Sequence, residues 1–293
     1  MAFKLFAIDF FFTNSIGSYT FDAQCEILKE LGYDAMYLCL MNEAKWNDLP
    51  RLATVRDRYG IDVAGVYANV DIAGDDGHEG NRRILRMLET IEGCDSVELG
   101  VLSSDKCVKP SDPDADDKAL AWLGRFLKVA ERRSLSVVLY PHMYFWMERI
   151  EDAVRLCRKM DHGCLGVAFC GYHWFVVDGK DLVARLELAA PFLRSVNLCG
   201  CTMSAAGRKE AASALDKPVG FLPASVQLIH EGALDNFLIL AALKRVGYSG
   251  KIGLQGYSIG GDAYGKLKES VEAFRSMVRR LDEHPEWGMF NPA

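Results

Sequence analysis

The feature that most constrains the fold is a regular alternation of short apolar runs with longer amphipathic stretches. Runs rich in β-branched and aromatic residues predict eight strands, at residues 4–9, 35–40, 62–67, 96–101, 136–140, 165–169, 195–198 and 251–254. Apolar residues at helical spacing predict helices at residues 21–31, 81–91, 117–132, 149–160, 182–190, 234–246 and 263–281. Strands that alternate with helices in this way predict an α/β protein, a (β/α)8 TIM barrel rather than a doubly wound sheet. We expect residues 1–293 to form one such domain.

Local signals place the ends of some elements and the loops between them. Thr20 is an expected N-cap and Gly32 an expected stop for the first long helix, and Asp262 is an expected cap for the last. Polar insertions at residues 71–80, 103–117 and 202–220 follow the third, fourth and seventh strands. In a TIM barrel these loops lie on the face that carries active sites. They are either ordinary solvated loops or part of a site, and the third is expected to include a short helix or a mobile lid.

Charge and composition exclude several classes of function. A net charge of -6, a pI near 5.6 and the absence of basic runs argue against a nucleic-acid surface. No stretch approaches the ~18 apolar residues of a membrane span, and Asp9 interrupts the first apolar run, which we read as a strand whose Asp9 points toward the barrel bottom. Nine scattered cysteines predict reduced thiols and a cytoplasmic protein. No glycine-rich nucleotide motif is present, and Cys199-Gly-Cys201 lacks the spacing of a zinc site.

Four segments resemble a known family. They are AQCEILKELGYDAMYL, RFLKVAERRSLSVVLYPH, LGVAFCGYHW and LDNFLILAALKRVGYSGKIGLQGY. They are similar to sugar phosphate isomerases and epimerases, which are xylose isomerase-like TIM barrels, and the resemblance runs from Phe3 to about Arg280. It implies a carbohydrate substrate. It also implies, for the metal-dependent members, a divalent ion held by Glu, Asp, His and Glu at the ends of strands five to eight.

This sequence departs from the family at all four of these metal-ligand positions. Carried over one by one, they fall on Tyr140, Cys170, Asn197 and Gln255. Three of the replacements, a phenol and two amides, are neutral at pH 7 and do not resemble the carboxylate-rich set that Mn²⁺ or Mg²⁺ prefers. Cys170 could bind a soft ion as a thiolate, but one such ligand does not make a site. We therefore expect no metal and no other cofactor, although a shifted register would readmit an ion such as Mn²⁺. The four side chains are expected either to bind sugar hydroxyls or simply to fill the space.

Two histidines that the resemblance places beside the substrate persist. His142 follows the fifth strand and His173 closes the loop after the sixth, where imidazoles can exchange protons with hydroxyls or an α-carbon. Glu98, which we place at the end of the fourth strand, is a further expected base, or else a partner in an ion pair. Trp174 and Tyr257 are expected to form aromatic walls for the apolar faces of a sugar, or to be part of the core.

Three hypotheses follow from these residues. The first is a sugar or keto-sugar isomerase, epimerase or lyase, in which His142 or Glu98 abstracts a proton next to a carbonyl and His173 protonates or orients the oxygen. The second is a carbohydrate-binding barrel without catalysis, since fold alone does not fix function. The third is a metal-dependent isomerase with a rearranged site built from His142, His173 and a carboxylate such as Glu98. Expected partners are a small sugar and, by analogy, a second copy in a homodimer; nucleic acid and membrane are not expected.

Overall fold

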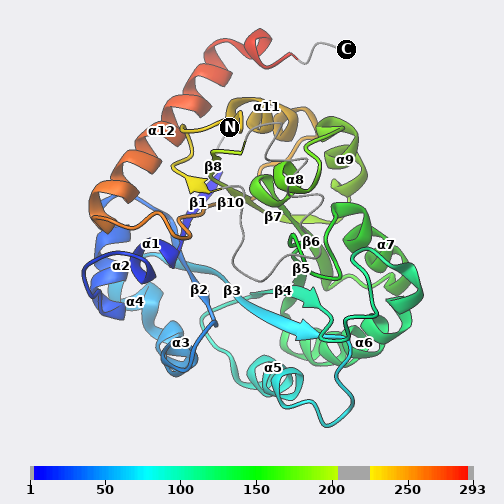
Figure 1. The fold of residues 1–293 in the computed structure, drawn as a ribbon. Coiled ribbons are helices and arrows are strands. Elements are labelled where there is room, and N and C mark those ends of the chain that lie inside the picture. The colour runs from blue at the N-terminus through cyan, green and yellow to red at the C-terminus, as the bar shows by residue number, and fades with distance from the viewer. Residues whose placement is uncertain (1–2, 204–224, 290–293) are drawn as a thin grey trace.

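The computed structural model describes residues 3–203 and 225–289, and its central feature is a closed barrel of eight parallel strands (Figure 1). Around the barrel the strands follow the order β1-β10-β7-β6-β5-β4-β3-β2, so each strand pairs with its neighbours in sequence and the last strand of the barrel closes on the first. The strands are β1 (Lys4–Ile8), β2 (Ala35–Cys39), β3 (Asp62–Asp71), β4 (Ser96–Leu102), β5 (Ser136–Leu139), β6 (Leu165–Cys170), β7 (Leu193–Leu198) and β10 (Lys251–Leu254). The predicted (β/α)8 TIM barrel is confirmed.

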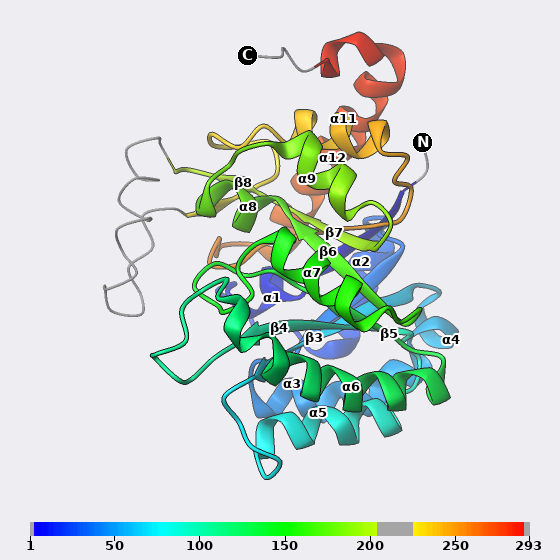
Figure 2. The same ribbon diagram turned by 90° about the vertical axis from the view of Figure 1, so that its right-hand side faces the viewer.

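Helices surround the barrel, and Figure 2 shows α3, α5 and α6 along one side of it. The long helices are α2 (Phe21–Glu30), α5 (Glu79–Thr90), α6 (Asp116–Arg133), α7 (Ile150–Met160), α9 (Leu182–Ala189), α11 (Asn236–Arg245) and α12 (Ala263–Glu283). Shorter helices are α1 (Phe10–Thr13), α3 (Glu43–Asp48), α4 (Val55–Tyr59) and α8 (Gly171–Val177). Short 3-10 turns lie at Leu49–Thr54, Pro113–Ala115 and Pro285–Gly288, and β8 (Gly200–Cys201) pairs with β9 (Val226–Gln227) outside the barrel. No helix in the described ranges has the length and apolarity needed to cross a membrane.

The predicted helix ends are confirmed by their caps. The Thr20 side chain accepts a hydrogen bond from the Ala23 amide at the start of α2, and Gly32 follows that helix in the left-handed conformation with φ of 77°. The Asp262 carboxylate accepts from the amides of Tyr264 and Gly265 and so caps α12. These side chains satisfy backbone groups that a helix terminus otherwise leaves without partners.

The short elements were not predicted, because they carry too few residues for a periodic pattern to stand out. They are α1, α3, α4, α8 and the β8–β9 pair. The first polar insertion also begins differently, since Asp71 is the last residue of β3 and Glu79 already begins α5. The expected lid or helix at residues 202–220 lies outside the described residues from position 204 onward.

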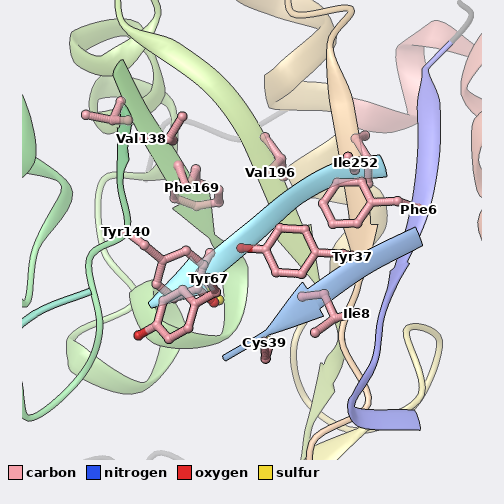
Figure 3. Packing of buried hydrophobic residues seen from close by; sticks show 14 of the residues in the cluster. Phe6, Ile8, Tyr37, Cys39, Tyr67, Val138, Tyr140, Phe169, Val196 and Ile252 are labelled. Carbon is pink, nitrogen blue, oxygen red and sulfur yellow. The ribbon is translucent and has the colours of Figure 1, made fainter. Parts of the chain in front are cut away.

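The barrel interior is filled by aromatic side chains that glycines on adjacent strands accommodate. Phe6 of β1 stacks on Tyr37 of β2, with ring centroids 5.2 Å apart. A Cβ at Gly253 would overlap the Phe6 ring and Asn197 Oδ1, so only glycine leaves room there. Figure 3 shows Tyr37, Tyr67 and Tyr140 extending into the same interior space, and the rings of the last two are 5.3 Å apart. The barrel centre is therefore a packed core that carries several polar atoms.

Candidate active site

The two predicted histidines lie together at the carboxyl end of the barrel. His142 follows β5 and His173 is the third residue of α8, directly after β6, and their ring centroids are 4.0 Å apart. His142 also stacks on Phe145 at 4.2 Å, while Tyr140 meets His173 edge-on at 5.5 Å. The two imidazoles thus have ring neighbours on both sides and lie together just beyond the ends of the adjacent strands β5 and β6, as the sequence predicts.

Both imidazoles are neutral at pH 7. Burial lowers the pKa of His142 to about 4, against a smaller opposite effect of the Met143 carbonyl. Burial likewise lowers the pKa of His173 well below its usual value, and the neighbouring His142 adds to that effect. His142 Nδ1 lies 2.7 Å from the Met143 carbonyl oxygen. A carbonyl only accepts, so we assign the proton to Nδ1, which leaves His142 Nε2 with a free lone pair.

Tyr140 and Cys170, two of the four replaced ligand positions, form a neutral pair. The Tyr140 hydroxyl hydrogen-bonds to the Cys170 sulfur, and both side chains are buried. Burial raises the pKa of the Cys170 thiol to about 11 and that of the Tyr140 hydroxyl well above its usual range. Neither group is therefore anionic at pH 7, and together they offer a neutral thiol and a neutral phenol.

Glu98 is not at the end of its strand, contrary to our prediction. It is the third residue of the seven-residue β4, only 2% exposed, and lies inside the barrel. Its carboxyl group accepts hydrogen bonds from Tyr37 at 2.6 Å, from Ser195 and, at 3.4 Å, from Asn197. Desolvation raises the pKa of Glu98 although these donors oppose it. All three of these donors are neutral, so within the described part of the chain Glu98 is hydrogen-bonded and not in the ion pair that was the alternative.

The two amides differ in their surroundings. Asn197 of β7 is fully buried; its nitrogen faces Glu98, and its Oδ1 has no hydrogen-bond partner among the described residues. Gln255, which follows β10, uses Oε1 to accept from the Tyr257 amide at 2.6 Å. Asn197 thus has an acceptor to offer within the barrel, whereas the acceptor of Gln255 is already engaged by its own loop.

The predicted aromatic walls are not part of the histidine cluster. Trp174 lies in α8, contacts Phe169 with centroids 6.1 Å apart and donates its indole N–H to the Lys180 carbonyl at 2.8 Å. Tyr257 is 42% exposed and meets Phe10 edge-on at 5.1 Å, on the β1–β10 side of the mouth. The rings that do contact the histidines are Tyr140, Phe145 and Tyr172.

Sequence reasoning placed Asp9 wrongly and missed its partner. Asp9 directly follows β1 and so lies at the carboxyl end of the barrel, where Lys45 Nζ of α3 is 2.7 Å from Oδ2. The Cys39 amide donates to Oδ1 at 3.2 Å. Burial raises the pKa of Asp9, and Lys45 acts in the opposite direction. The signal available in the sequence was the position of Asp9 immediately after a predicted strand, which favours the mouth over the bottom.

The residues that could hold a cation together lie elsewhere. Among the described ranges, one group of three potential ligands has its ligand atoms within 4.8 Å of one another: His230, Glu231 and Glu269. It joins the loop after β9 to α12 and is partly exposed. His142, His173 and Glu98 also lie in the described ranges, and they do not form such a group. The three residues named in the third hypothesis are therefore not placed to bind one ion.

Comparison with known proteins identifies relatives of the fold. A family model described as xylose isomerase-like TIM barrel matches residues 25–277. No curated protein matches the chain. Among solved structures, the IolI protein with a bound zinc atom is 17% identical with a TM-score of 0.75, covering 94% of this chain and 98% of its own.

Two epimerases are also among the similar structures. The 3-keto-D-glucoside 4-epimerase from E. coli is 16% identical with a TM-score of 0.69, covering 94% of this chain and 99% of its own. An L-ribulose 3-epimerase is 14% identical with a TM-score of 0.71 and covers 100% of both chains. At these identities the likeness shows the fold alone.

Proposed function

The chain belongs to the xylose isomerase-like TIM barrel family, and on that premise we propose that it is a sugar or keto-sugar isomerase, epimerase or lyase. The reaction moves a proton at a carbon next to a carbonyl group. The observation that carries this proposal is the pair of neutral imidazoles, His142 and His173, with ring centroids 4.0 Å apart at the end of the barrel that carries sites in this fold.

The two histidines take different roles. His142 Nε2 removes the proton from the carbon next to the carbonyl, and the electron pair of that C–H bond becomes the C=C bond of an enediol. The carbonyl oxygen meanwhile accepts a hydrogen bond or a proton from His173.

Return of the proton to the former carbonyl carbon gives an isomer, while the hydroxyl on the first carbon loses its proton and becomes the new carbonyl. Protonation of the first carbon on its opposite face gives an epimer, while the first oxygen loses the proton it gained and becomes the carbonyl again. If the electron pair of the enediol instead forms a C=C bond to the β-carbon, the β-substituent leaves with its bonding pair and takes up a proton, which gives a lyase product.

The low pKa of His142, about 4, favours a keto-sugar substrate. A base with this pKa is available at every physiological pH but is weak, so the C–H bond must already be acidified. A carbonyl next to the reacting carbon does this without further help. Glu98 is the poorer base, because Tyr37 and Ser195 engage its carboxyl group inside the barrel.

We further propose that the divalent ion of metal-dependent relatives has no counterpart in this barrel. Tyr140 and Cys170 are held in their neutral forms by burial, and Asn197 and Gln255 provide only amide groups. Mn²⁺ and Mg²⁺ favour sites that contain carboxylates, so this donor set does not fit them. In the proposed reaction these side chains bind hydroxyl groups, and the free acceptor is Asn197 Oδ1.

Two of the structurally similar proteins are named for sugar epimerisation, one of them on a keto-glucoside. This supports a carbohydrate substrate but does not identify it. The same neutral hydrogen-bonding set also suits a carbohydrate-binding barrel without catalysis. The two functions differ in one observable: only the enzyme exchanges a carbon-bound proton of the sugar.

The test is proton exchange of keto-sugars in deuterated water, followed by NMR. We expect wild-type protein to wash deuterium into the position next to the carbonyl, and the His142→Asn/His173→Asn double variant to lose at least roughly 100-fold of that rate. His284→Asn, at a half-exposed histidine near the C-terminus, is the matched control. Exchange that survives the double substitution would sink the proposal, and binding without exchange would establish the carbohydrate-binding alternative.

A further inference from the structure

Three potential metal ligands lie together outside the barrel, between the loop that follows β9 and helix α12. They are His230 and Glu231 of the loop and Glu269 of the helix, and their ligand atoms all lie within 4.8 Å of one another. His230 Nε2 is 3.3 Å from Glu269 Oε1. Two ligands bound to one Zn²⁺ at about 2.0 Å and at the tetrahedral angle are themselves about 3.3 Å apart. This pair therefore already has the separation of two ligands that share an ion.

Hydrogen bonds fix the loop that carries two of the three ligands. The Asn236 side-chain amide donates to the carbonyl oxygens of Cys199 and Ile229, at 2.9 and 2.7 Å. The Glu231 carboxylate accepts from the Leu228 amide at 3.1 Å and has further lone pairs for an ion. A ligand whose orientation is already set by a second hydrogen bond loses little freedom when it binds a metal.

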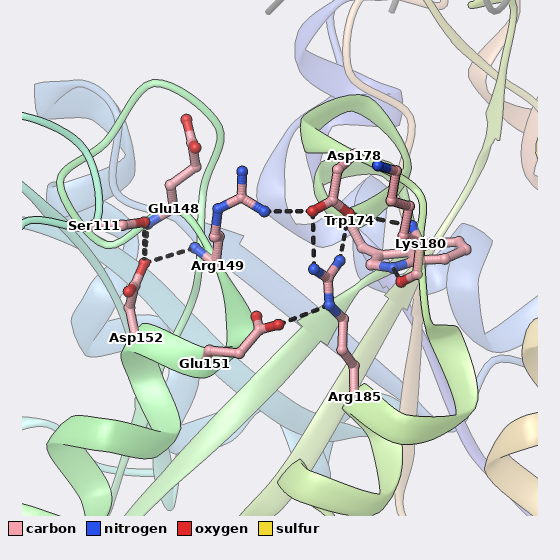
Figure 4. A network of polar contacts seen from close by, with 9 residues as sticks. All are labelled: Ser111, Glu148, Arg149, Glu151, Asp152, Trp174, Asp178, Lys180 and Arg185. Atoms are coloured by element: carbon pink, nitrogen blue, oxygen red, sulfur yellow. Dashed lines mark hydrogen bonds and ion pairs between the residues drawn. The ribbon is translucent and has the colours of Figure 1, made fainter.

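The two carboxylates of this group have no basic partner that would balance them. In the part of the chain that the structure describes, Glu231 forms no ion pair with a lysine or arginine, and Glu269 pairs only with His230. Figure 4 shows a different arrangement in the network of α7 and α9, where Arg185 faces Glu151. Two carboxylates this close repel each other, and a divalent cation removes the repulsion whereas a neutral imidazole does not.

We infer that His230, Glu231 and Glu269 bind a divalent transition-metal ion such as Zn²⁺, with water as the fourth ligand. One imidazole and two carboxylates suit Zn²⁺, while Ca²⁺ and Mg²⁺ favour oxygen ligands alone. The ion reaches the site from solvent, since the side chains of His230 and Glu269 are 36% and 49% exposed. It joins the loop after β9 to α12. Because it lies outside the barrel, its binding does not depend on the proposed reaction.

The test is calorimetric titration of chelator-treated protein with Zn²⁺. We expect one strong site per chain, and binding at least roughly 100-fold weaker in the His230→Asn/Glu269→Gln double variant. His284→Asn/Glu286→Gln, at a second His–Glu pair, is the matched control and should bind as the wild-type protein does. Zn²⁺ at about 100 times its Kd should raise the Tm of the wild-type protein by roughly 3–8 °C and leave that of the double variant unchanged.

Co²⁺ absorption identifies the ligands, because the exposed Cys107 is a competing thiol. The inferred site should give no thiolate-to-metal band, and such a band would assign the ion to a cysteine and overturn the inference. No Zn²⁺ binding by the wild-type protein, or binding that the double variant keeps in full, would do the same. If the double variant does not fold, Glu231→Gln alone should weaken Zn²⁺ binding about 10-fold. Displacement of Zn²⁺ by an equal concentration of Mg²⁺ would contradict a transition-metal site.

Discussion

The inner and outer sides of strands β5 and β6 hold their titratable groups in opposite states. Inside the barrel, burial keeps Cys170 protonated, with a pKa of about 11, and His142 unprotonated, with a pKa of about 4. Outside, Arg185 and Arg149 hold the pKa of Asp178 down to about 2, although burial acts in the opposite direction. The inner side is a set of neutral donors and acceptors, and the outer side is a network of full charges.

The difference follows from the available partners. A charge is stable in a protein where a counter-charge accompanies it and the group keeps some exposure to solvent, and the outer network has both. The described interior near Glu98 offers hydroxyl and amide donors only, and desolvation raises the pKa of Glu98 although these donors oppose it. The outer side is thereby suited to fixing the position of α7, α8 and α9. The function proposed above uses His142 and His173 of the inner side to move protons.

Placing a charge inside the barrel should have the largest effect on stability. Asn197→Asp has the same shape as the wild-type residue, but it replaces a donor to Glu98 by a second carboxyl group. We expect a loss of roughly 3–5 kcal/mol in the free energy of unfolding at pH 7, by urea denaturation. The loss should shrink at pH 4.5, where the added group binds a proton more readily. If the variant and the wild-type protein had the same free energy of unfolding at pH 7, the description of the interior as intolerant of an added charge would be wrong.

Acid should act on the same interior through His142. Between the unfolded pKa of about 6.5 and the folded pKa of about 4, the unfolded chain binds a proton that the folded chain does not. The free energy of unfolding therefore falls as pH is lowered through this window, by roughly 2–3 kcal/mol after allowance for partial exposure. His142→Phe should flatten this part of the pH–stability curve, and His284→Phe is the matched control. A curve that keeps its full slope in the first variant would disprove the shift.

The outer network should be tested by removing its central charge. Asp178→Asn leaves Arg149 and Arg185 without their shared counter-ion, and we expect a loss of about 1–3 kcal/mol, because the group is partly screened by water. Glu187→Gln, which breaks an exposed pair, should cost less than about 0.5 kcal/mol. High salt should narrow the gap between the two variants. A larger loss for the exposed pair would reverse the assignment of the outer side as the stabilising network.

The sequence predicts the barrel well and the site only in part, for a physical reason. Strand periodicity is a local property, and it located all eight strands of the barrel. The depth of a side chain in the barrel depends on strand register and on how far each strand extends. Neither can be read from a short stretch of sequence, so the sequence placed Glu98 wrongly at the end of its strand. The pairing of Asp9 with Lys45 depends on the short helix α3, which is too short for a periodic pattern to mark it. These are properties of packing, which no short stretch of sequence carries.

The smallest effect should come from the hydrogen bond between the neutral Tyr140 and Cys170 side chains. Tyr140→Phe removes the hydroxyl that contacts the Cys170 sulfur and leaves the ring in place. We expect a loss of only about 0.5–1.5 kcal/mol in the free energy of unfolding. The Tyr140 hydroxyl lowers the pKa of the Cys170 thiol, so its removal should raise that pKa further. Alkylation of Cys170, measured by mass spectrometry over a range of pH, should then be slower in the variant. Faster alkylation at a lower pH would mean that Cys170 is a thiolate in the wild-type protein, and the inner side would then be a charged site after all.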